Sequence, residues 1–423
     1  MSTTKPVSTP AARIAAGELG LRELLHDRNF SLYLAGCATS GFGSVLSTMA
    51  LTFAVLDLSR SAAGLGLVLL CSRLPGIALT LTGGVIADRV SRRTLALWTD
   101  AFRTLLQACT AVILLSGHTN VAVLAGLQTL AGGAGAIFAP AAAAMVAGIA
   151  PGGQVRRTNS LLGIATAISQ TGGLALSGVI VALAGLSLSF MIDSATFAVS
   201  TVTLALIRLP FVAPKLRRGA LGELREGWRS VFARRWLVVC AFHETVVNVL
   251  ALGPFFVLGP LVAKQSLGGV TGWSAIALGY VLGNLAAAHV TYHWAPRRPI
   301  VAVLLVNLAL APLLVLLGLC ASVWLCAPAA ALMGASSTVY NTLVNSAVQS
   351  NVPDQVLART MAITGLGSTV LAPLGMGLAG VVAASIGAPA VLIGGALLVV
   401  LVSLICGALP AARVQLRLDQ EVP

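Results

Sequence analysis

Between two long apolar segments the chain reads Gly83-Gly84-Val85-Ile86-Ala87-Asp88-Arg89-Val90-Ser91-Arg92-Arg93. Each flanking segment, roughly 63–87 and 94–117, is long enough to cross a membrane as a helix. Because the connection is short, the two helices are expected to be antiparallel neighbours, with glycines at their contact. Arg92 and Arg93 indicate that the connection is cytoplasmic, since arginine and lysine accumulate in cytoplasmic loops.

The composition of the whole chain is that of a membrane protein. Of its 423 residues, 57% are hydrophobic and 9% are charged, whereas a soluble domain carries about 25% charged residues. Most lysines and arginines lie in or beside segments expected to be cytoplasmic, with Arg60 and Lys264 in outer loops. This asymmetry predicts cytoplasmic termini. It also accounts for the net charge of +13 without nucleic acid as a partner.

Hydropathy predicts an all-α polytopic membrane protein with twelve transmembrane helices in two pseudo-symmetric bundles of six. The predicted spans are 30–56, 63–87, 94–117, 120–148, 158–183, 187–209, 236–262, 272–293, 299–320, 323–348, 360–386 and 388–409. The predicted domains are a cytoplasmic tail (1–29), a first bundle (30–209), a cytoplasmic linker (210–235), a second bundle (236–409) and a cytoplasmic tail (410–423).

The linker has its own helical pattern. Apolar residues recur on one face at Leu221, Leu224, Trp228, Val231 and Phe232. Together with the neighbouring arginines, they predict a basic amphipathic helix on the inner membrane surface. A solvated linker is the alternative.

The two sides of the linker repeat one another. When Pro151 is placed on Pro353 without gaps, identical residues coincide. The aligned residues of the first half are Arg157, Thr158, Gly163, Gly173, Gly178, Val179, Ala182 and Gly185. Their counterparts in the second half are, in the same order, Arg359, Thr360, Gly365, Gly375, Gly380, Val381, Ala384 and Gly387. Repeated halves with a binding site near the midplane are typical of secondary transporters.

The order G-x-x-x-D-R-x-S-R-R resembles the helix 2–3 signature of the major facilitator superfamily. The matching residues are Gly84, Asp88, Arg89, Arg92 and Arg93, and Ser91 replaces the usual glycine. In that family the loop acts as a cytoplasmic latch between the two halves. A generic basic turn is the alternative, although topology alone does not require the aspartate.

Further short stretches resemble the branch of enterobactin exporters and macrolide efflux proteins. They include Arg28-Asn29-Phe30, Met191-Ile-Asp193-Ser-Ala-Thr-Phe197 and Leu224-Arg-Glu-Gly-Trp228. The resemblance implies a proton-driven exporter of small amphipathic molecules, such as siderophores or antibiotics, of the kind that confers multidrug resistance. The antiporter motif of drug exporters is altered, with Leu174 in place of its proline. An importer or uniporter of a small metabolite therefore stays an alternative.

Few ionisable residues lie within the predicted spans, where charge is costly and marks function. Glu244 is the deepest acid and the first candidate for proton coupling, because a carboxyl group there can load and release a proton. Asp193 is the second candidate, with bonding between helices as its alternative. Arg73 is a candidate for binding an anionic substrate group or pairing with an acid. Asp100 is expected to pair with Arg103 on the same helix face.

Polar side chains on several spans are expected to line a central cavity, because they must face away from lipid. The candidates are Ser40, Ser44, Gln170, Asn248, Tyr340, Asn341 and Asn345. Hydroxyl and amide side chains also join helices to one another, which is the alternative for each of them.

Several classes of protein are disfavoured. The chain has no G-x-x-x-x-G-K-[ST] loop for ATP and no H-E-x-x-H or cysteine–histidine cluster for a metal. We expect no enzyme activity, cofactor or metal. The predicted protein is a monomer whose partners are a small-molecule substrate, protons and membrane lipid. The preference for arginine, alanine and glycine favours a bacterium and hence its cytoplasmic (inner) membrane, crossed many times. The substrate cannot be identified from these residues.

Overall fold

The structure is a computed structural model that describes residues 21–87, 91–150, 155–208, 220–294, 296–365 and 370–414. All regular elements in these ranges are helices. The earlier ones are α2 (Leu21–His26), α3 (Arg28–Ser59), α4 (Ala62–Ala87), α5 (Arg92–Leu115), α6 (Val121–Ile149) and α7 (Val155–Leu206). The later ones are α8 (Ala220–Phe232), α9 (Arg235–Val247), η2 (Asn248–Leu252), α10 (Gly253–Ser266), α11 (Val270–His293), α12 (Pro299–Val306), η3 (Asn307–Leu310), α13 (Ala311–Gly318), α14 (Val323–Asn351), α15 (Asp354–Thr364), α16 (Ala372–Ile386), α17 (Ala388–Ala408) and η5 (Pro410–Arg413).

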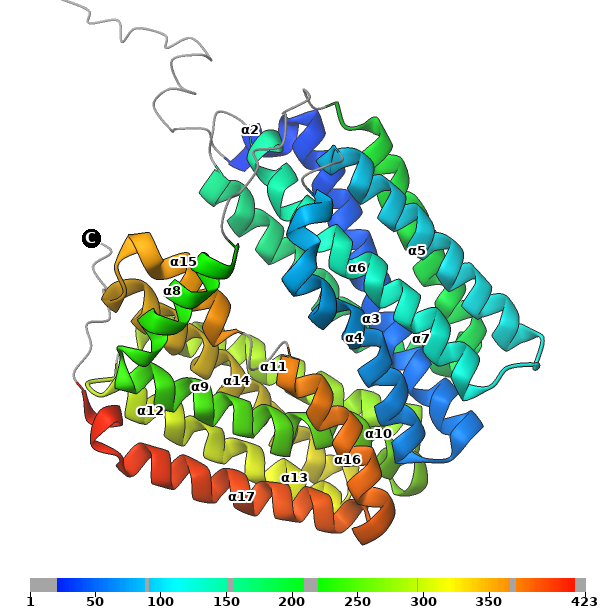
Figure 1. Ribbon diagram of the computed structural model, residues 1–423. Coiled ribbons are helices and arrows are strands. Elements are labelled where there is room, and N and C mark those ends of the chain that lie inside the picture. The colour runs from blue at the N-terminus through cyan, green and yellow to red at the C-terminus, as the bar shows by residue number, and fades with distance from the viewer. Residues whose placement is uncertain are drawn as a thin grey trace, which may run out of the picture.

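The helices gather in two groups, which follow one another along the chain. Figure 1 shows α2 to α7, blue to green, in one group and α8 to α17, green to red, in the other. The groups lie close together around α4, α10 and α16, and diverge towards α2, α8 and α15. We call these the first group and the second group.

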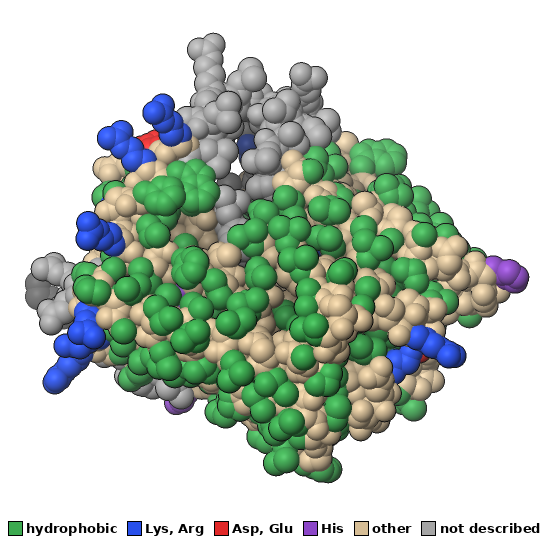
Figure 2. Space-filling view, turned by 60° about the horizontal axis from the view of Figure 1, so that its bottom comes forward, with side chains coloured by type: hydrophobic (Ala, Val, Ile, Leu, Met, Phe, Trp, Pro, Cys, Tyr) green, Lys and Arg blue, Asp and Glu red, His purple; other side chains and the backbone are tan. Residues whose placement is uncertain are grey.

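The surface of both groups suits a lipid environment. Within the described ranges, nine helices are long and apolar enough to cross a membrane. Large apolar side chains point outward from them, such as Leu183, 84% exposed, and Trp324, 88% exposed. Figure 2 shows hydrophobic side chains spread over one face of the molecule, with lysine and arginine towards its edges. These helices therefore form a polytopic membrane protein.

Several predicted spans differ from regular, separate helices. The predicted spans 158–183 and 187–209 form one element, α7, which is broken at Gly185 (φ 81°). The seventh span contains the π-helical segment η2, because Pro254 just after it has no N–H to donate to the turn before it. The predicted span 360–386 was wrong as a single regular helix, since α15 begins earlier and ends at Thr364 while α16 starts at Ala372.

The sequence repeat has a structural counterpart. Gly185 and Gly387, which coincide in the alignment of the two halves, both adopt positive φ angles, of 81° and 86°, between consecutive long helices. Glycine reaches this region of φ without the steric cost that a side chain adds. Thr158 and Thr360, which also coincide, are both fully buried. The two halves therefore share identical residues, and their helices break at corresponding positions.

The linker helix α8 packs on α15 at the start of the eleventh predicted span. The Ser230 and Thr360 hydroxyls lie 2.7 Å apart, and Glu226 pairs with Arg359. Of the predicted apolar face of α8, Val231 is buried, Trp228 and Phe232 are exposed, and the side chains of Leu221 and Leu224 lie outside the described residues. Packing on α15 divides the apolar residues between two sides of the helix.

Candidate transport site

The apolar cores of the two groups join at one end of the molecule and are separate at the other. One buried cluster contains Leu51 and Leu65 of the first group with Leu258 and Trp273 of the second. The other two clusters each belong to a single group. One, around Tyr33, lies in the first group, and the other, which includes Tyr340, lies in the second. The end with the shared core carries the α3–α4 turn at Arg60, which the sequence predicts to be external.

Small residues form the contact between the groups at this joined end. A Cβ atom on Gly380 would lie 2.3 Å from the Ala62 carbonyl oxygen, and one on Gly178 would lie 1.6 Å from the Ser274 hydroxyl. Gly178 and Gly380 coincide in the sequence repeat, so α7 meets α11 much as α16 meets α4. We call these contacts the glycine seam. Such close approach of helices is typical of packing by small residues in membranes.

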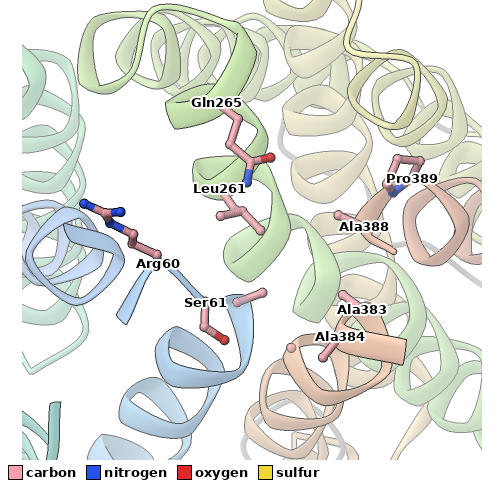
Figure 3. Close-up of a pocket in the computed structure, with 10 residues that line it drawn as sticks. Arg60, Ser61, Leu261, Gln265, Ala383, Ala384, Ala388 and Pro389 are labelled. Atoms are coloured by element: carbon pink, nitrogen blue, oxygen red, sulfur yellow. The ribbon is translucent and has the colours of Figure 1, made fainter. Parts of the chain in front are cut away.

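An ion pair and a pocket accompany the glycine seam. Lys264 Nζ in α10 lies 2.5 Å from Asp57 Oδ1 in α3, and both side chains are partly exposed. A pocket of about 320 Å³ lies between the groups nearby. Its lining comes from both groups: Arg60, Ser61, Ala62, Leu261, Gln265, Gly380, Ala383, Ala384, Ala388 and Pro389. Figure 3 shows Gln265 and Leu261 projecting from one helix towards Ser61, while Arg60 extends away from them.

Glu244 lies where the shared core gives way to the separate ones. On its own span, Val247 belongs to the shared cluster, whereas Cys240, one turn before Glu244, belongs to the separate cluster of the second group. The Glu244 side chain is half-buried, and the Tyr340 hydroxyl of α14 lies 3.5 Å from Glu244 Oε2. The same hydroxyl donates to the Cys240 carbonyl at 3.2 Å. Among the described residues, Glu244 thus has one long side-chain hydrogen bond, at the place where the shared apolar core ends.

The helix beside Glu244 is irregular. Asn248 begins the π-helical segment η2 and donates from Nδ2 to the Glu244 carbonyl at 2.9 Å. At the end of this segment, a Cβ atom on Gly253 would lie 2.7 Å from the Gly375 carbonyl carbon of α16. Single π turns inside α-helices occur often at functional sites. The seventh span therefore changes its helical winding between Glu244 and its contact with α16.

His243, next to Glu244 in sequence, points elsewhere. It is fully buried, and its Nε2 lies 2.9 Å from the Ser403 hydroxyl of α17. Successive residues of an α-helix point about 100° apart, so the His243 side chain packs between helices. The His243 ring also stacks on that of Tyr340, with centroids 6.3 Å apart, so both titratable residues of the seventh span contact Tyr340, and His243 also contacts α17.

The predicted cavity residues fall into two sets. Four of them are exposed on α4, α7 and α14, which are candidate membrane spans: Arg73, Gln170, Asn341 and Asn345. Ser40 and Ser44 of α3 are half-buried. Tyr340 and Asn248 are buried instead, and both bond to α9 beside Glu244. The predicted cavity residues therefore do not form one group. Six of them are exposed or half-buried, and two are buried beside Glu244.

Asp193 lies inside the first group in a network of side chains. It is fully buried and accepts a hydrogen bond on Oδ2 from Gln107 Nε2 at 2.6 Å. Gln128 Nε2 in turn lies 3.4 Å from Gln107 Oε1, so the chain links α7, α5 and α6. The two glutamines were not singled out from the sequence, since amides on apolar helices resemble many others. Asp193 has the surroundings of a residue that joins helices.

A second acid of the first group lies on the same interface between α5 and α7. Asp100 is fully buried, accepts from the Ser200 hydroxyl at 2.6 Å, and lies 3.8 Å from Arg103 Nη1. The expected pairing of Asp100 with Arg103 is therefore confirmed. The Arg103 guanidinium also lies 3.9 Å from the ring centre of Phe197, a stabilising arrangement for a desolvated cation.

Replacing Asp193 by Asn is expected to destabilise the protein. A carboxylate accepts hydrogen bonds on two oxygens, whereas the asparagine amide accepts on only one. A buried polar group left without a partner lowers the free energy of unfolding by about 1–3 kcal/mol. Apparent melting temperature in detergent should fall by several degrees and yield should drop. Glu244→Gln is the matched control and should melt as the parent does, because Glu244 has one long contact. Equal melting of the Asp193→Asn variant and the parent would contradict this role.

The predicted latch is described only in part. Asp88 and Arg89 lie outside the described residues, and Gly84 belongs to α4. Arg92 begins α5 and is exposed. Arg93 donates from Nε to the Leu204 carbonyl at 2.9 Å and from Nη2 to the Ala205 carbonyl at 2.5 Å, at the end of α7. The free carbonyls at a helix C-terminus favour such a cation.

Known proteins resemble this chain over nearly its whole length. A family model described as transmembrane secretion effector matches residues 24–420. The multidrug efflux pump Tap of Mycolicibacterium fortuitum is 26% identical over 399 residues, or 90% of this chain and 96% of Tap. The uncharacterized MFS-type transporter YfiS of Bacillus subtilis is 27% identical over 389 residues, or 87% of this chain and 90% of YfiS.

Solved structures of transporters share the fold at low sequence identity. A bacterial homologue of the iron transporter ferroportin in an inward-facing state matches with a TM-score of 0.69 and 15% identity, over 92% of this chain and all of that one. An auto-inhibited POT family peptide transporter matches with a TM-score of 0.72 and 14% identity, over 94% of this chain and 99% of that one. With the family model covering residues 24–420, the chain belongs to the transmembrane secretion effector family of major facilitator transporters.

Proposed function

We propose that this protein exports small amphipathic molecules across the cytoplasmic membrane of a bacterium in exchange for protons. The observation that carries the proposal is the position of Glu244. It is a half-buried acid where the core shared by both groups ends, next to a π-helical segment. Similarity to a multidrug efflux pump supports export of an antibiotic, a siderophore or another natural product.

Alternating access accounts for the shared and separate cores. The glycine seam closes the outer ends of the two groups. The proposed substrate contacts are the exposed or half-buried polar residues Arg73, Gln170, Asn341, Asn345, Ser40 and Ser44. In this proposal the structure corresponds to a state open to the cytoplasm. Substrate enters from that side, and the outer seam must open for release.

The surroundings of the acids support proton exchange. Of the acids that the structure describes on the spans, Asp100 and Asp193 are fully buried in bonded networks, whereas Glu244 is half-buried. Arginine stays protonated, and hydroxyl groups do not change charge near neutral pH. Glu244 is therefore the proposed proton carrier, and Tyr340 and Asn248 are the residues that hold it and its helix in place.

The proposed organisation has twelve spans in two bundles of six, with the linker and both termini in the cytoplasm. Nine described helices satisfy the length and hydropathy of a span. Counting α7 as two spans about Gly185, and adding α5 and the α15–α16 unit, gives the twelve. The segment with Gly84, Asp88, Arg89, Arg92 and Arg93 is the proposed cytoplasmic latch. We propose a monomer without cofactor or metal.

The orientation has a direct test. In a variant whose seven cysteines are replaced by alanine, Arg60→Cys should react with an impermeant thiol reagent on intact cells. Arg297→Cys should react only after the membrane is opened, because its loop is cytoplasmic under the positive-inside rule. Both arginines are exposed, so access to the reagent depends on the side of the membrane. Labelling of position 297 but not position 60 on intact cells would contradict the proposed orientation and indicate the opposite one.

Export has a cellular test. The protein is produced in a bacterium that lacks its own efflux pumps, and the cells are screened against amphipathic antibiotics and dyes. At least one compound should accumulate less in producing cells, and a protonophore should abolish the difference. Accumulation that instead rises in producing cells would favour an importer or a uniporter.

A further inference from the structure

The side of α8 that faces away from α15 combines aromatic and basic residues. Trp228 and Phe232 are 43% and 64% exposed, and their rings stack with centroids 5.5 Å apart. Arg225 and Arg229 are exposed as well. Residues four apart lie above one another on a helix, so the two aromatic residues form one row and the two arginines form the next. We call these four residues the α8 face.

The opposite side of α8 is already occupied by protein. The Ser230 hydroxyl lies 2.7 Å from that of Thr360, and Gly227 is so close to α15 that a Cβ atom would lie 2.8 Å from Ile363 Cγ1. Glu226, the acid of α8 closest to the arginine row, is paired with Arg359. The negative charge beside the α8 face is therefore neutralised, and the face as a whole is apolar and positive.

We propose that the α8 face docks on anionic phospholipid headgroups of the inner leaflet. Tryptophan and phenylalanine rows favour the boundary between headgroups and acyl chains, and the neighbouring arginines favour phosphate. Each arginine near an anionic surface strengthens binding about fivefold. The inference takes from the proposed function only the cytoplasmic side of α8.

Docking has a consequence for the second group. Because α8 is bonded to α15 through Ser230 and Glu226, a lipid that holds α8 also holds the start of the eleventh span. The same span continues into α16, which carries Gly380 of the glycine seam. Anionic lipid is therefore placed to act on the helix that closes the outer end.

Tryptophan quenching tests the docking in the full-length protein. The protein is reconstituted in phosphatidylcholine vesicles that contain an equal fraction of either brominated phosphatidylglycerol or brominated phosphatidylcholine. The difference in quenching between the parent and Trp228→Phe isolates the signal of Trp228. We expect this signal to be quenched at least twice as strongly by brominated phosphatidylglycerol.

Paired arginine variants separate docking from general charge. Arg225→Gln/Arg229→Gln should reduce the preference for phosphatidylglycerol to near equality, while Arg297→Gln/Arg298→Gln, two exposed arginines before α12, should keep it. Equal quenching of Trp228 by both lipids in the parent would overturn the proposal, because the face would then contact lipid without preference for an anionic headgroup. Absence of quenching by either lipid would also overturn it, because protein or water would then cover this face. Loss of the preference in the control pair as well would also overturn it. These outcomes concern lipid alone and leave the proposal of export unaffected.

Discussion

Glu244→Gln is expected to lose gradient-driven export completely while it still binds substrate and exchanges it without energy. A pH difference of one unit supports about tenfold accumulation for each proton exchanged. Without a group that changes charge, the accumulation ratio should fall to about one. Glutamine keeps the shape of the side chain and its contact with Tyr340, which lies 3.5 Å from Glu244 Oε2, so the fold should be unchanged.

Uptake of a labelled compound into inside-out vesicles measures this effect, first with an acidic interior and then as exchange at equal pH. Glu226→Gln is the matched control, because it removes an exposed carboxylate of α8 that is paired with Arg359. The control should retain concentrative transport. Should Glu244→Gln still concentrate substrate while Asp193→Asn, purified in folded form, does not, the proton carrier is Asp193.

Gly380→Ala is expected to slow transport at least tenfold by holding the outer ends apart. The added Cβ would lie 2.3 Å from the Ala62 carbonyl oxygen and 2.8 Å from the Ala63 Cα, and neither backbone atom can rotate away. Overpacking costs about 1–3 kcal/mol, which corresponds to about a 5- to 150-fold shift in a conformational equilibrium. The state with the joined outer end should lose that much of its population.

Two controls separate packing from other causes. Gly394→Ala places a Cβ in open space on α17, and should transport as the parent does. Lys264→Gln breaks the ion pair with Asp57, which is partly exposed and contributes about 0–1 kcal/mol. Its effect should be fivefold at most. Spin labels on the outer ends of α4 and α16 should report a greater separation in Gly380→Ala, and an unchanged separation together with normal transport would exclude the glycine seam as the closing contact.

Hydropathy and the repeated glycines were sufficient to predict the helical class and most helix boundaries. A run of apolar residues specifies a membrane helix because the backbone must satisfy its own hydrogen bonds in lipid. Gly185 and Gly387, where the helices break, both lie in the gaps between predicted spans. These features depend on local sequence, which is why they could be predicted without the structure.

The packing around the candidate site could not be predicted in the same way. Helical spacing put Tyr340 and Asn341 on adjacent positions of one span, but only the structure distinguishes the buried phenol beside Glu244 from the exposed amide. The π-helical segment after Glu244 was also missed, although Gly253-Pro254 signals an irregular turn. The pair Asp57–Lys264 joins residues far apart in sequence, and no local pattern indicates it.

Substrate-driven proton movement is the direct sign of proton exchange through Glu244. Inside-out vesicles with an acidic interior and a pH-sensitive dye are given a compound identified in the cellular screen. We expect that adding the compound releases protons from the parent vesicles, as the compound accumulates, and releases none from Glu244→Gln vesicles. Accumulation of the compound in parent vesicles with no proton release would contradict it.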